Sequence, residues 1–281
     1  MLKWKCRNHV FSLNERPLIM GILNVTPDSF SDGGRFYDRE AAINHGLRMV
    51  KEGADIIDIG GESTRPGAEA VNTETELGRV IPVIEKLKEK SDTVISIDTM
   101  KAEVAHRAIE AGASIINDVS AMNHDAEMPG VAAETGAGVV LMHMKGTPHN
   151  MQDNPQYDDV VTEVRDYLKA CVDNLIARGV NRDTLAVDPG IGFGKTVDQN
   201  VELLAGLELL AELGFPVVVG LSRKSFLGKL TGCKKADKRL PASLAALSFC
   251  ALKGAHVMRV HDARESFDAV RVIAVLKEKR R

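Results

Sequence analysis

Residues 185–196 read LAVDPGIGFGKT, and this stretch decides which kind of α/β fold the sequence predicts. Its last three residues fit a nucleotide phosphate loop, but that pattern needs a glycine where Pro189 stands. The dinucleotide pattern G-x-G-x-x-G fails as well, because Lys195 takes the place of its third glycine. We therefore interpret the stretch as an apolar strand that ends on Asp188 and continues into a glycine-rich turn. Lys195 is then expected to be a charge of that loop, or one that supports a site from behind.

Seven further runs of the same kind occur along the chain, and helical segments separate them. Each run is rich in Val, Ile, Leu and Met on both faces, which is typical of parallel strands covered by helices. The dipeptide Gly-Ala recurs before four of the strands, at Gly53, Gly112, Gly136 and Gly254, as a repeated helix-to-strand turn. The seven runs are RPLIMGILN, ADIIDIGG, TVISIDT, ASIIND, AGVVLMHM, FPVVVGLS and AHVMRVHD.

Eight such units predict an α/β protein with the fold of a single (β/α)8 TIM barrel over residues 1–281. Residues 1–16 are expected to be an N-terminal extension or a short strand. An open doubly wound sheet is the alternative, but it usually has fewer strands and a glycine-rich turn after the first one, which is missing here. Long loops are predicted after strands one, two and seven, at residues 25–38, 60–72 and 221–240. They follow the carboxyl ends of strands, where barrel enzymes build their active sites.

The composition indicates a globular protein of the cytoplasm. The chain is 44% hydrophobic and 27% charged, and its net charge of −3 argues against a nucleic-acid partner. Its four cysteines form no paired motif and are expected to be reduced thiols. The first residues lack the apolar core of a signal peptide, and the longest apolar run, residues 242–252, is explained by a buried helix. We therefore expect no membrane association.

Polar residues stand where the predicted strands end. Each has an ordinary structural explanation: Asp98 can cap a helix, Asn117 can close a turn, and His143 is best explained as a core histidine. Carboxylates or amides at the ends of strands one, three, four and six nevertheless favour one shared pocket over four separate caps. The polar residues at strand ends are Asn24, Asp58, Glu62, Asp98, Asn117, His143, Asp188, Lys224, Arg259 and His261.

The residue types indicate what such a pocket binds. A carboxylate accepts two parallel N–H donors, which suits the 2-amino group and ring N–H of a pterin or a guanine. Lys224 and Asn117 can meet the acceptor side of the same ring. Arg65 and Arg259 can clamp oxyanions, whereas Arg223 is better explained as a surface salt bridge. Asn24 is a neutral ligand, so alone it implies a weak Mg²⁺ site completed by phosphate and water.

Eight segments together resemble the dihydropteroate synthase family in order and spacing, from about Pro17 to the last helix. The first dozen residues and roughly residues 229–243 match no pattern on which the resemblance depends. The longest segments, around residues 24–34 and 61–67, are the most specific. The segments are MGILNVTPDSFSDGG, DIIDIGGESTRPG, SIDTMK, INDVS, LMHMKGTPHNMQ, DPGIGFGK, SRKSFLG and RVHD.

The resemblance implies a TIM barrel that joins a dihydropterin-methyl diphosphate to 4-aminobenzoate, releasing diphosphate, and a homodimer with Mg²⁺ as cofactor. It implies pterin contacts from Asp98, Asn117, Asp188 and Lys224. It implies diphosphate contacts from Asn24, which also holds the metal, Thr64, Arg65, Arg259 and His261. It implies aminobenzoate contacts from Thr64, Pro66, Phe193 and Ser225. Asp28, Arg65 and Lys224 are expected to be the catalytic residues, and the long loops that carry Asp28, Arg65 and Pro66 are expected to close over bound diphosphate.

Chemistry favours a dissociative, SN1-like path for this reaction. Diphosphate leaves readily once its charge is balanced, and the dihydropterin can delocalise the resulting cation, so the arylamine needs no strong base. Two alternatives stay open. The first is a methyltransferase that passes a methyl group from methyltetrahydrofolate to a corrinoid, which has no reason to carry the cationic set. The second is a catalytically silent pterin-binding or partner protein, which would be expected to lose Asn24, Arg65, Lys224 or Arg259.

Overall fold

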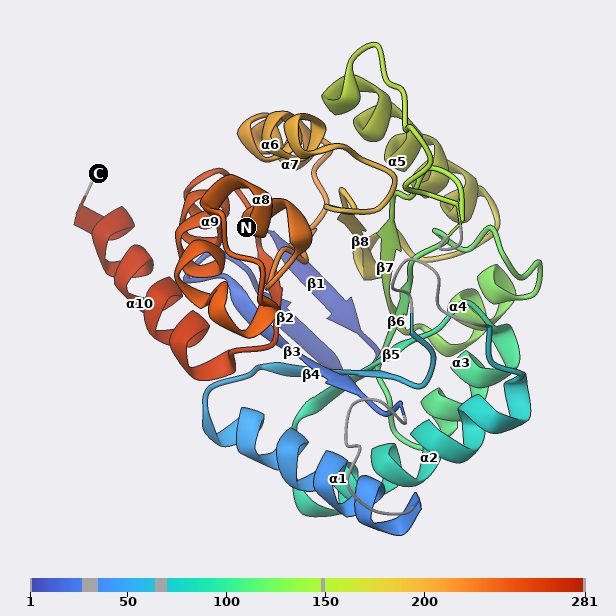
Figure 1. Cartoon of the computed structure of the whole chain (residues 1–281). Helices are drawn as coiled ribbons and strands as arrows, with labels where there is room; N and C mark the ends of the chain where they lie inside the picture. The colour runs from blue at the N-terminus through green and yellow to red at the C-terminus, as the bar shows by residue number, and fades with distance from the viewer. Residues whose placement is uncertain (1, 27–34, 64–69, 148–149, 280–281) are drawn as a thin grey trace.

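The computed structural model describes residues 2–26, 35–63, 70–147 and 150–279, with the backbone alone for residues 35–38. Eight parallel strands of this part form a barrel with helices around its outside (Figure 1). Neighbouring strands follow the order β8-β7-β6-β5-β4-β3-β10-β9, and a parallel bridge from Val187 to Val217 joins the two edges. The predicted TIM barrel is thereby confirmed, with one strand in each apolar run. The strands are β3 (Leu18–Asn24), β4 (Ile56–Gly60), β5 (Val94–Asp98), β6 (Ile115–Asp118), β7 (Gly138–Met142), β8 (Leu185–Asp188), β9 (Val218–Val219) and β10 (Val257–Val260).

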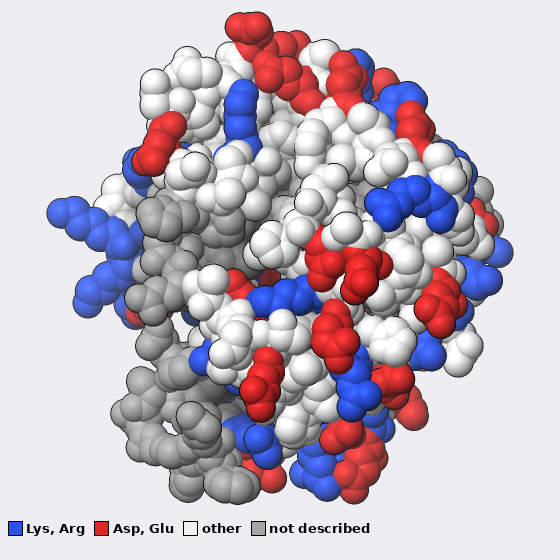
Figure 2. All heavy atoms as spheres, turned by 90° about the vertical axis from the view of Figure 1, so that its right-hand side faces the viewer, with Lys and Arg blue, Asp and Glu red and all other residues white. Residues whose placement is uncertain are grey.

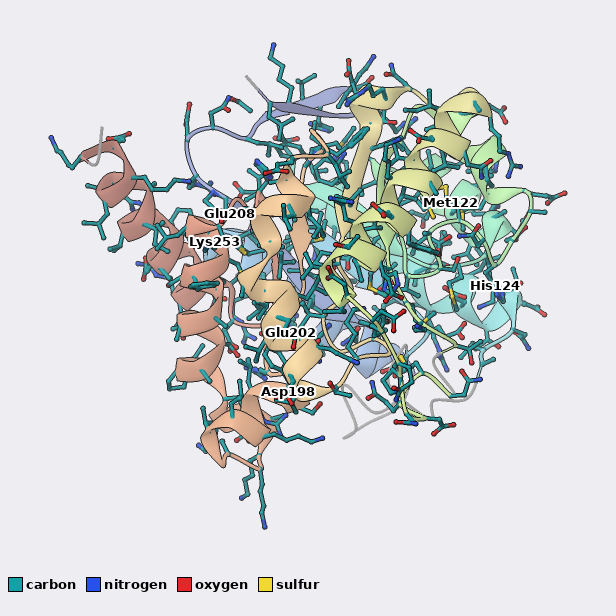
Figure 3. All side chains as sticks on the ribbon, turned by 90° about the horizontal axis from the view of Figure 1, so that it is seen from above. Met122, His124, Asp198, Glu202, Glu208 and Lys253 are labelled. Carbon is teal, nitrogen blue, oxygen red and sulfur yellow. The ribbon has the colours of Figure 1, made fainter. Side chains whose placement is uncertain are left out.

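Helices separate the strands and cover the barrel. Thr196, which suggested a phosphate-loop threonine, is instead the N-cap of α6, where its side chain and that of Gln199 bond to each other's backbone N–H groups. On the outside, Lys253 forms an ion pair with Glu208 of α7 at 2.9 Å (Figure 3). The helices are α1 (Arg35–Lys51), α2 (Thr73–Lys90), α3 (Ala102–Glu110), α4 (Met128–Thr135), α5 (Val160–Ala177), α6 (Val197–Ala205), α7 (Leu207–Ala211), α8 (Ser225–Thr231), α9 (Leu240–Leu252) and α10 (Ala263–Lys279).

The connections differ in part from those expected. The predicted loop at residues 221–240 contains α8 and a short 3₁₀ turn (η3, Ala236–Lys238). A long connection that the sequence did not indicate follows β7, because α5 begins only at Val160. The expected buried helix at residues 242–252 forms as α9, but Phe249 and Leu252 are 43% and 47% exposed, so one face of it is open. No helix in the described part of the chain is long and apolar enough to cross a membrane.

Two apolar cores hold the barrel together. The larger lies between the strands and the surrounding helices, and the smaller fills the barrel interior with side chains such as Met20, Ile56 and Val140. The chain's first residues, expected as an extension or a short strand, form an antiparallel hairpin of β1 (Lys3–Cys6) and β2 (His9–Ser12). The hairpin adds the buried Trp4 and Cys6 to the inner core, and Trp4 donates to the carbonyl of Thr184 before β8 at 2.8 Å. An apolar hairpin therefore seals the amino-terminal end of the barrel.

The polar side of the barrel is its other end. Acidic and basic side chains are interspersed over the outer face shown in Figure 2, without a field of one sign. Inside the barrel, by contrast, polar and acidic groups gather above the apolar layer: Asp58, Asp98, Asn117 and Asp188 are all buried near the carboxyl ends of their strands. Burial of this kind needs compensation from partners or from a ligand.

Candidate active site

Strand register brings three of the predicted site residues into one row. Asn24 is paired with Gly60, Gly60 with Asp98, and Asp98 with Asn117, across the ends of β3, β4, β5 and β6. Gly60, between them, has no side chain. A Cβ placed on it would lie 3.7 Å from both Asn24 Oδ1 and Asp98 Oδ2, so these two oxygens flank the position of Gly60. Since side chains at equivalent positions of neighbouring parallel strands project to the same face, Asn24, Asp98 and Asn117 line one wall of the barrel mouth.

Arg259 lies against this wall and neutralises two carboxylates. Its Nε is 2.6 Å from Asp58 Oδ2 and its Nη2 is 2.6 Å from Asp98 Oδ2. Asn117 Nδ2 donates to the same Asp58 oxygen at 3.1 Å. Burial raises the pKa of Asp98, and the charge of Arg259 opposes that rise. Burial lowers the pKa of Arg259, but Asp58 and Asp98 outweigh it and raise the pKa overall, so the guanidinium stays charged.

Two buried carboxylate oxygens of this cluster have no hydrogen-bond partner in the described part of the chain. They are Oδ1 of Asp58 and Oδ1 of Asp98, and the buried hydroxyl of Ser96 is unpaired as well. An unpaired buried polar group costs roughly 1–3 kcal/mol, and more when it is charged. Such groups are uncommon in native proteins, and N–H donors of a bound ligand would satisfy them.

Asp188 and Lys224 form the opposite wall. Asp188 Oδ1 accepts the N–H of Gly190 at 2.7 Å, and burial raises the pKa of this carboxyl, which the charge of Lys224 opposes. Lys224 Nζ donates to the carbonyl of Ile191 and lies 4.5 Å from the centre of the Phe193 ring. Burial lowers the pKa of Lys224 to about 7, whereas Asp188 acts to raise it. The wall therefore offers a carboxylate and an amine that changes charge near neutral pH.

The glycine-rich turn after β8 supplies these contacts because its backbone packs closely against the end of β7. Gly190 has a φ of +66°, and a Cβ on it would lie 1.8 Å from the carbonyl oxygen of His143. A residue with a side chain cannot occupy this position without moving the turn. The glycines of LAVDPGIGFGKT thus have a structural reason that is unrelated to phosphate binding.

His143 and Lys195 lie under this turn. His143 is 5% exposed, as expected of a core histidine, and its ring meets that of Tyr167 edge-on at 4.9 Å. Lys195 is only 3% exposed and its Nζ is 3.0 Å from His143 Nδ1. Lys195 lies on the loop between β8 and α6, as expected, and its ammonium is enclosed there rather than solvated. Its position also fits a charge that supports the site from behind.

The remaining cationic residues are divided between the site and the surface. His261 bonds through its N–H to Ser222 Oγ at 3.3 Å and contacts the same oxygen through Nδ1 at 3.1 Å, at the end of β10. Arg223 forms a two-point ion pair with Asp262, which confirms its assignment as a salt bridge. Asp28, Thr64, Arg65 and Pro66 lie outside the described residues.

Ser225 is exposed at the first residue of α8, directly after Lys224. It borders a cavity of ≈ 360 Å³ whose walls also include Gly192, Gln152 and Lys229. The cavity joins α8 to the long connection after β7, which the sequence did not point out. Phe193, which follows Gly192 on the same turn, is half-buried.

The described residues hold no group of three or more His, Cys, Asp or Glu side chains that could bind a metal by themselves. Asn24 is half-buried at the end of β3 and offers one amide oxygen. That donor set fits Mg²⁺ only if phosphate oxygens and water complete the shell, since this ion keeps several waters and binds through few protein ligands.

The sequence left two features of the site without a role. Asp58 stood among the strand-end residues but was given no contact, and the structure makes it the partner of both Arg259 and Asn117. Glu62 is not in the pocket: Lys101 binds it together with Glu76, at 2.5 Å from Glu76 Oε2. The signal for the role of Asp58 was an aspartate within the apolar run IIDIG. Nothing in the local sequence indicated that Glu62 pairs with Lys101.

Comparison with known proteins gives consistent matches over nearly the whole chain. A profile of the pterin binding enzyme family matches residues 20–261. The dihydropteroate synthase of Escherichia coli (strain K12) is 46% identical over 257 residues, which are 92% of this chain and 90% of the relative. A solved structure of Xanthomonas albilineans dihydropteroate synthase with 4-aminobenzoic acid has a TM-score of 0.92 at 47% identity and covers 98% of both chains. A structure of the same species' enzyme with 7,8-dihydropteroate has a TM-score of 0.89 at 44% identity, again over 98% of both.

Proposed function

The chain belongs to the pterin binding enzymes, in the dihydropteroate synthase family, and on this basis we propose how its barrel mouth carries out the reaction of that family. The enzyme is a transferase: it joins (7,8-dihydropterin-6-yl)methyl diphosphate to 4-aminobenzoate and releases 7,8-dihydropteroate and diphosphate, a step of folate synthesis. The observation that carries the site assignment is the set of buried carboxylates at the barrel mouth, two of which keep an oxygen without a partner in the described part of the chain.

The pterin ring lies between the two walls in this proposal. Asp188 accepts the 2-amino group and the neighbouring ring N–H, since a carboxylate takes two parallel donors. Asp98 and Asn117 face the opposite edge, and Lys224 donates to a ring acceptor. The unpaired Oδ1 atoms of Asp98 and Asp58 support this placement, because a ring rich in N–H groups would satisfy them.

The diphosphate is assigned to Asn24, Thr64, Arg65, Arg259 and His261. Arg259 uses Nε and Nη2 for carboxylates, so we propose that it also positions the pterin wall while facing the anion. His261 bonds to Ser222 at the end of β10, in the part of a TIM barrel where phosphates are usually bound. Arg65 would supply positive charge to the diphosphate, because the guanidinium of Arg259 is already paired with Asp58 and Asp98.

Mg²⁺ is proposed as the cofactor, held by Asn24 together with the substrate's phosphate oxygens. When bound, the ion supplies positive charge that stabilises the leaving diphosphate. The protein's part is to offer one amide oxygen and to leave the other positions to phosphate and water, which the single donor at residue 24 supports.

The aminobenzoate is assigned to Thr64, Pro66, Phe193 and Ser225. The Phe193 ring lies 4.5 Å from the ammonium of Lys224, Ser225 follows Lys224 in the sequence, and the cavity that Ser225 lines provides open space next to it. The substrate's amino group would then face the pterin methylene, while its carboxylate points towards the exposed start of α8.

Bond breaking precedes bond making in the proposed path. The C–O bond to diphosphate breaks with its electron pair going to the phosphate oxygen, and the pterin ring delocalises the cation that remains. The arylamine nitrogen then forms the C–N bond and loses one proton. Asp28, Arg65 and Lys224 are the proposed catalytic residues, the first two on loops that would close to keep water from the cation.

The proposal also includes the domain organisation, the location and the oligomeric state of the protein. We propose one pterin-binding domain over residues 1–281 that acts in the cytoplasm as a homodimer. The open face of α9 and α10 supports association, because five large apolar side chains are exposed on these neighbouring helices, namely Phe249, Leu252, Val272, Val275 and Leu276. Sedimentation of the purified protein tests it: a monomer at micromolar concentration would contradict the dimer.

Product identification tests the proposed reaction. Incubation with both substrates and Mg²⁺ is expected to give dihydropteroate, identified by its mass. A second incubation with methyltetrahydrofolate and a corrinoid tests the methyltransferase alternative, and methylation of the corrinoid would contradict the proposal. Pterin binding without any product would favour the catalytically silent alternative.

A further inference from the structure

Lys195 has no part in the reaction described so far, yet its ammonium group is enclosed by the molecule. It is 3% exposed, and three partners surround its Nζ. The carbonyl oxygens of Gly190 and Phe193 each lie at 2.9 Å, and His143 Nδ1 lies at 3.0 Å. Two of these partners belong to the glycine-rich turn and the third to the end of β7.

The number of partners equals the number of donors. A charged ammonium has three N–H groups, so the two carbonyls and an unprotonated Nδ1 use all of them. A neutral amine has two N–H groups for the carbonyls and a lone pair that can accept from a protonated Nδ1. Burial lowers the pKa of Lys195 to about 7 and that of His143 to about 3, so the imidazole stays neutral and can serve in either tautomer. The cluster therefore keeps its bonds whether or not Lys195 is charged.

The turn that Lys195 holds carries the contacts of the opposite wall. Asp188 begins the turn. The carbonyl of Ile191 accepts from Lys224, and the ring of Phe193 lies 4.5 Å from the ammonium of Lys224. The turn has little freedom, since a Cβ on Gly194 would lie 2.5 Å from the carbonyl oxygen of Lys145. Without Lys195, the two carbonyls lose their shared donor, and the bond from the Phe193 N–H to the Gly190 carbonyl at 3.0 Å is left to hold the turn across its centre.

We propose that Lys195, with His143 as its support, is a positioning residue that fixes the turn so that Phe193 and Lys224 meet both substrates in the correct place. The proposal rests on the assignment of the aminobenzoate and pterin contacts above. Lys195 acts through the turn and touches neither substrate. A displacement of about 1 Å in such a turn is enough to cost roughly a hundredfold in rate, so the effect on catalysis is expected to exceed the effect on folding.

The variant Lys195→Met tests this, because methionine keeps the length and removes all three donors. We expect the KM for aminobenzoate to rise about tenfold or more and kcat to fall, while a directly measured pterin Kd rises less, since Asp98 and Asn117 are on the other wall. Trp4→Phe is the matched control: it removes the 2.8 Å bond to Thr184 at the far end of the barrel. It should lower Tm and leave both KM values unchanged.

A KM for aminobenzoate equal to that of the wild type in Lys195→Met, with only Tm reduced, would overturn the proposal. If that variant does not fold, His143 decides: His143→Asn keeps an acceptor near the position of Nδ1 and should behave like the wild type, whereas His143→Leu should raise the same KM. Equal KM values in the two His143 variants also overturn it. Absence of turnover in the wild type, by contrast, contradicts the proposed function and is read in the same assay.

Discussion

The replacement Asp188→Asn is the sharpest perturbation of the pterin site. It preserves the shape of the side chain and leaves one oxygen able to accept the Gly190 N–H, which lies 2.7 Å from Asp188 Oδ1. It also replaces an acceptor by an NH₂ group that would face the donors of the pterin edge. The change therefore removes pterin recognition without removing the local support of the turn.

The expected loss can be worked from the bonds involved. Two hydrogen bonds to a charged acceptor contribute about 1.5–3 kcal/mol each, and one of them can partly persist through the remaining oxygen. A net loss of about 3 kcal/mol corresponds to roughly 150-fold weaker pterin binding. The buried Lys224 also loses the carboxylate that raises its pKa, so its charged form should become scarcer at neutral pH.

Calorimetric titration with a 6-hydroxymethylpterin measures the effect directly. Asp198→Asn is the matched control, because Asp198 is an exposed aspartate on α6 (Figure 3) and outside the site. The control should bind as the wild type does, and both variants should keep the wild-type circular dichroism spectrum. Wild-type pterin affinity in Asp188→Asn would refute the assignment of Asp188 to the pterin edge.

Three further outcomes are expected. Sulfonamides mimic the arylamine acid and should compete with aminobenzoate in steady-state kinetics; noncompetitive inhibition would count against contacts at Phe193 and Ser225. Chelation of Mg²⁺ should stop turnover but leave binding of a pterin without diphosphate unchanged, and loss of that binding would contradict a metal held only by Asn24 and phosphate. Burial lowers the pKa of Lys195 to about 7 from 10.5, so between these values the unfolded chain binds a proton that the folded protein does not, and stability rises with pH. The Tm of the wild type minus that of Lys195→Met should therefore grow from pH 7 to about pH 10, and a constant difference would show that Lys195 is not perturbed.

The local pattern of the sequence was sufficient for the barrel. Each apolar run closed by a polar residue forms a strand. A strand of a parallel sheet is buried on both faces, so a short run that is apolar on both faces predicts such a strand. The row of Asn24, Asp98 and Asn117 followed from the same pattern, since carboxyl ends of parallel strands meet at one end of a barrel.

Contacts between distant residues could not be predicted in this way. The pairing of Arg259 with Asp58 joins residues 201 positions apart, and the enclosure of Lys195 depends on β7 lying beside the turn after β8. A lysine in a glycine-rich stretch is usually solvated, so only the packed structure reveals that three partners surround it. The hairpin of β1 and β2 could not be predicted for the same reason. Trp4 is buried at the end of the barrel, where it bonds to Thr184, a residue 180 positions later in the sequence.

The release of diphosphate, followed with a coupled enzymatic assay, tests the central claim most directly. Diphosphate should appear only when the pterin diphosphate and 4-aminobenzoate are both present, in equal amount to dihydropteroate. Release at the same rate without aminobenzoate would mean that water reaches the cation and that the barrel mouth is not the condensing site proposed here.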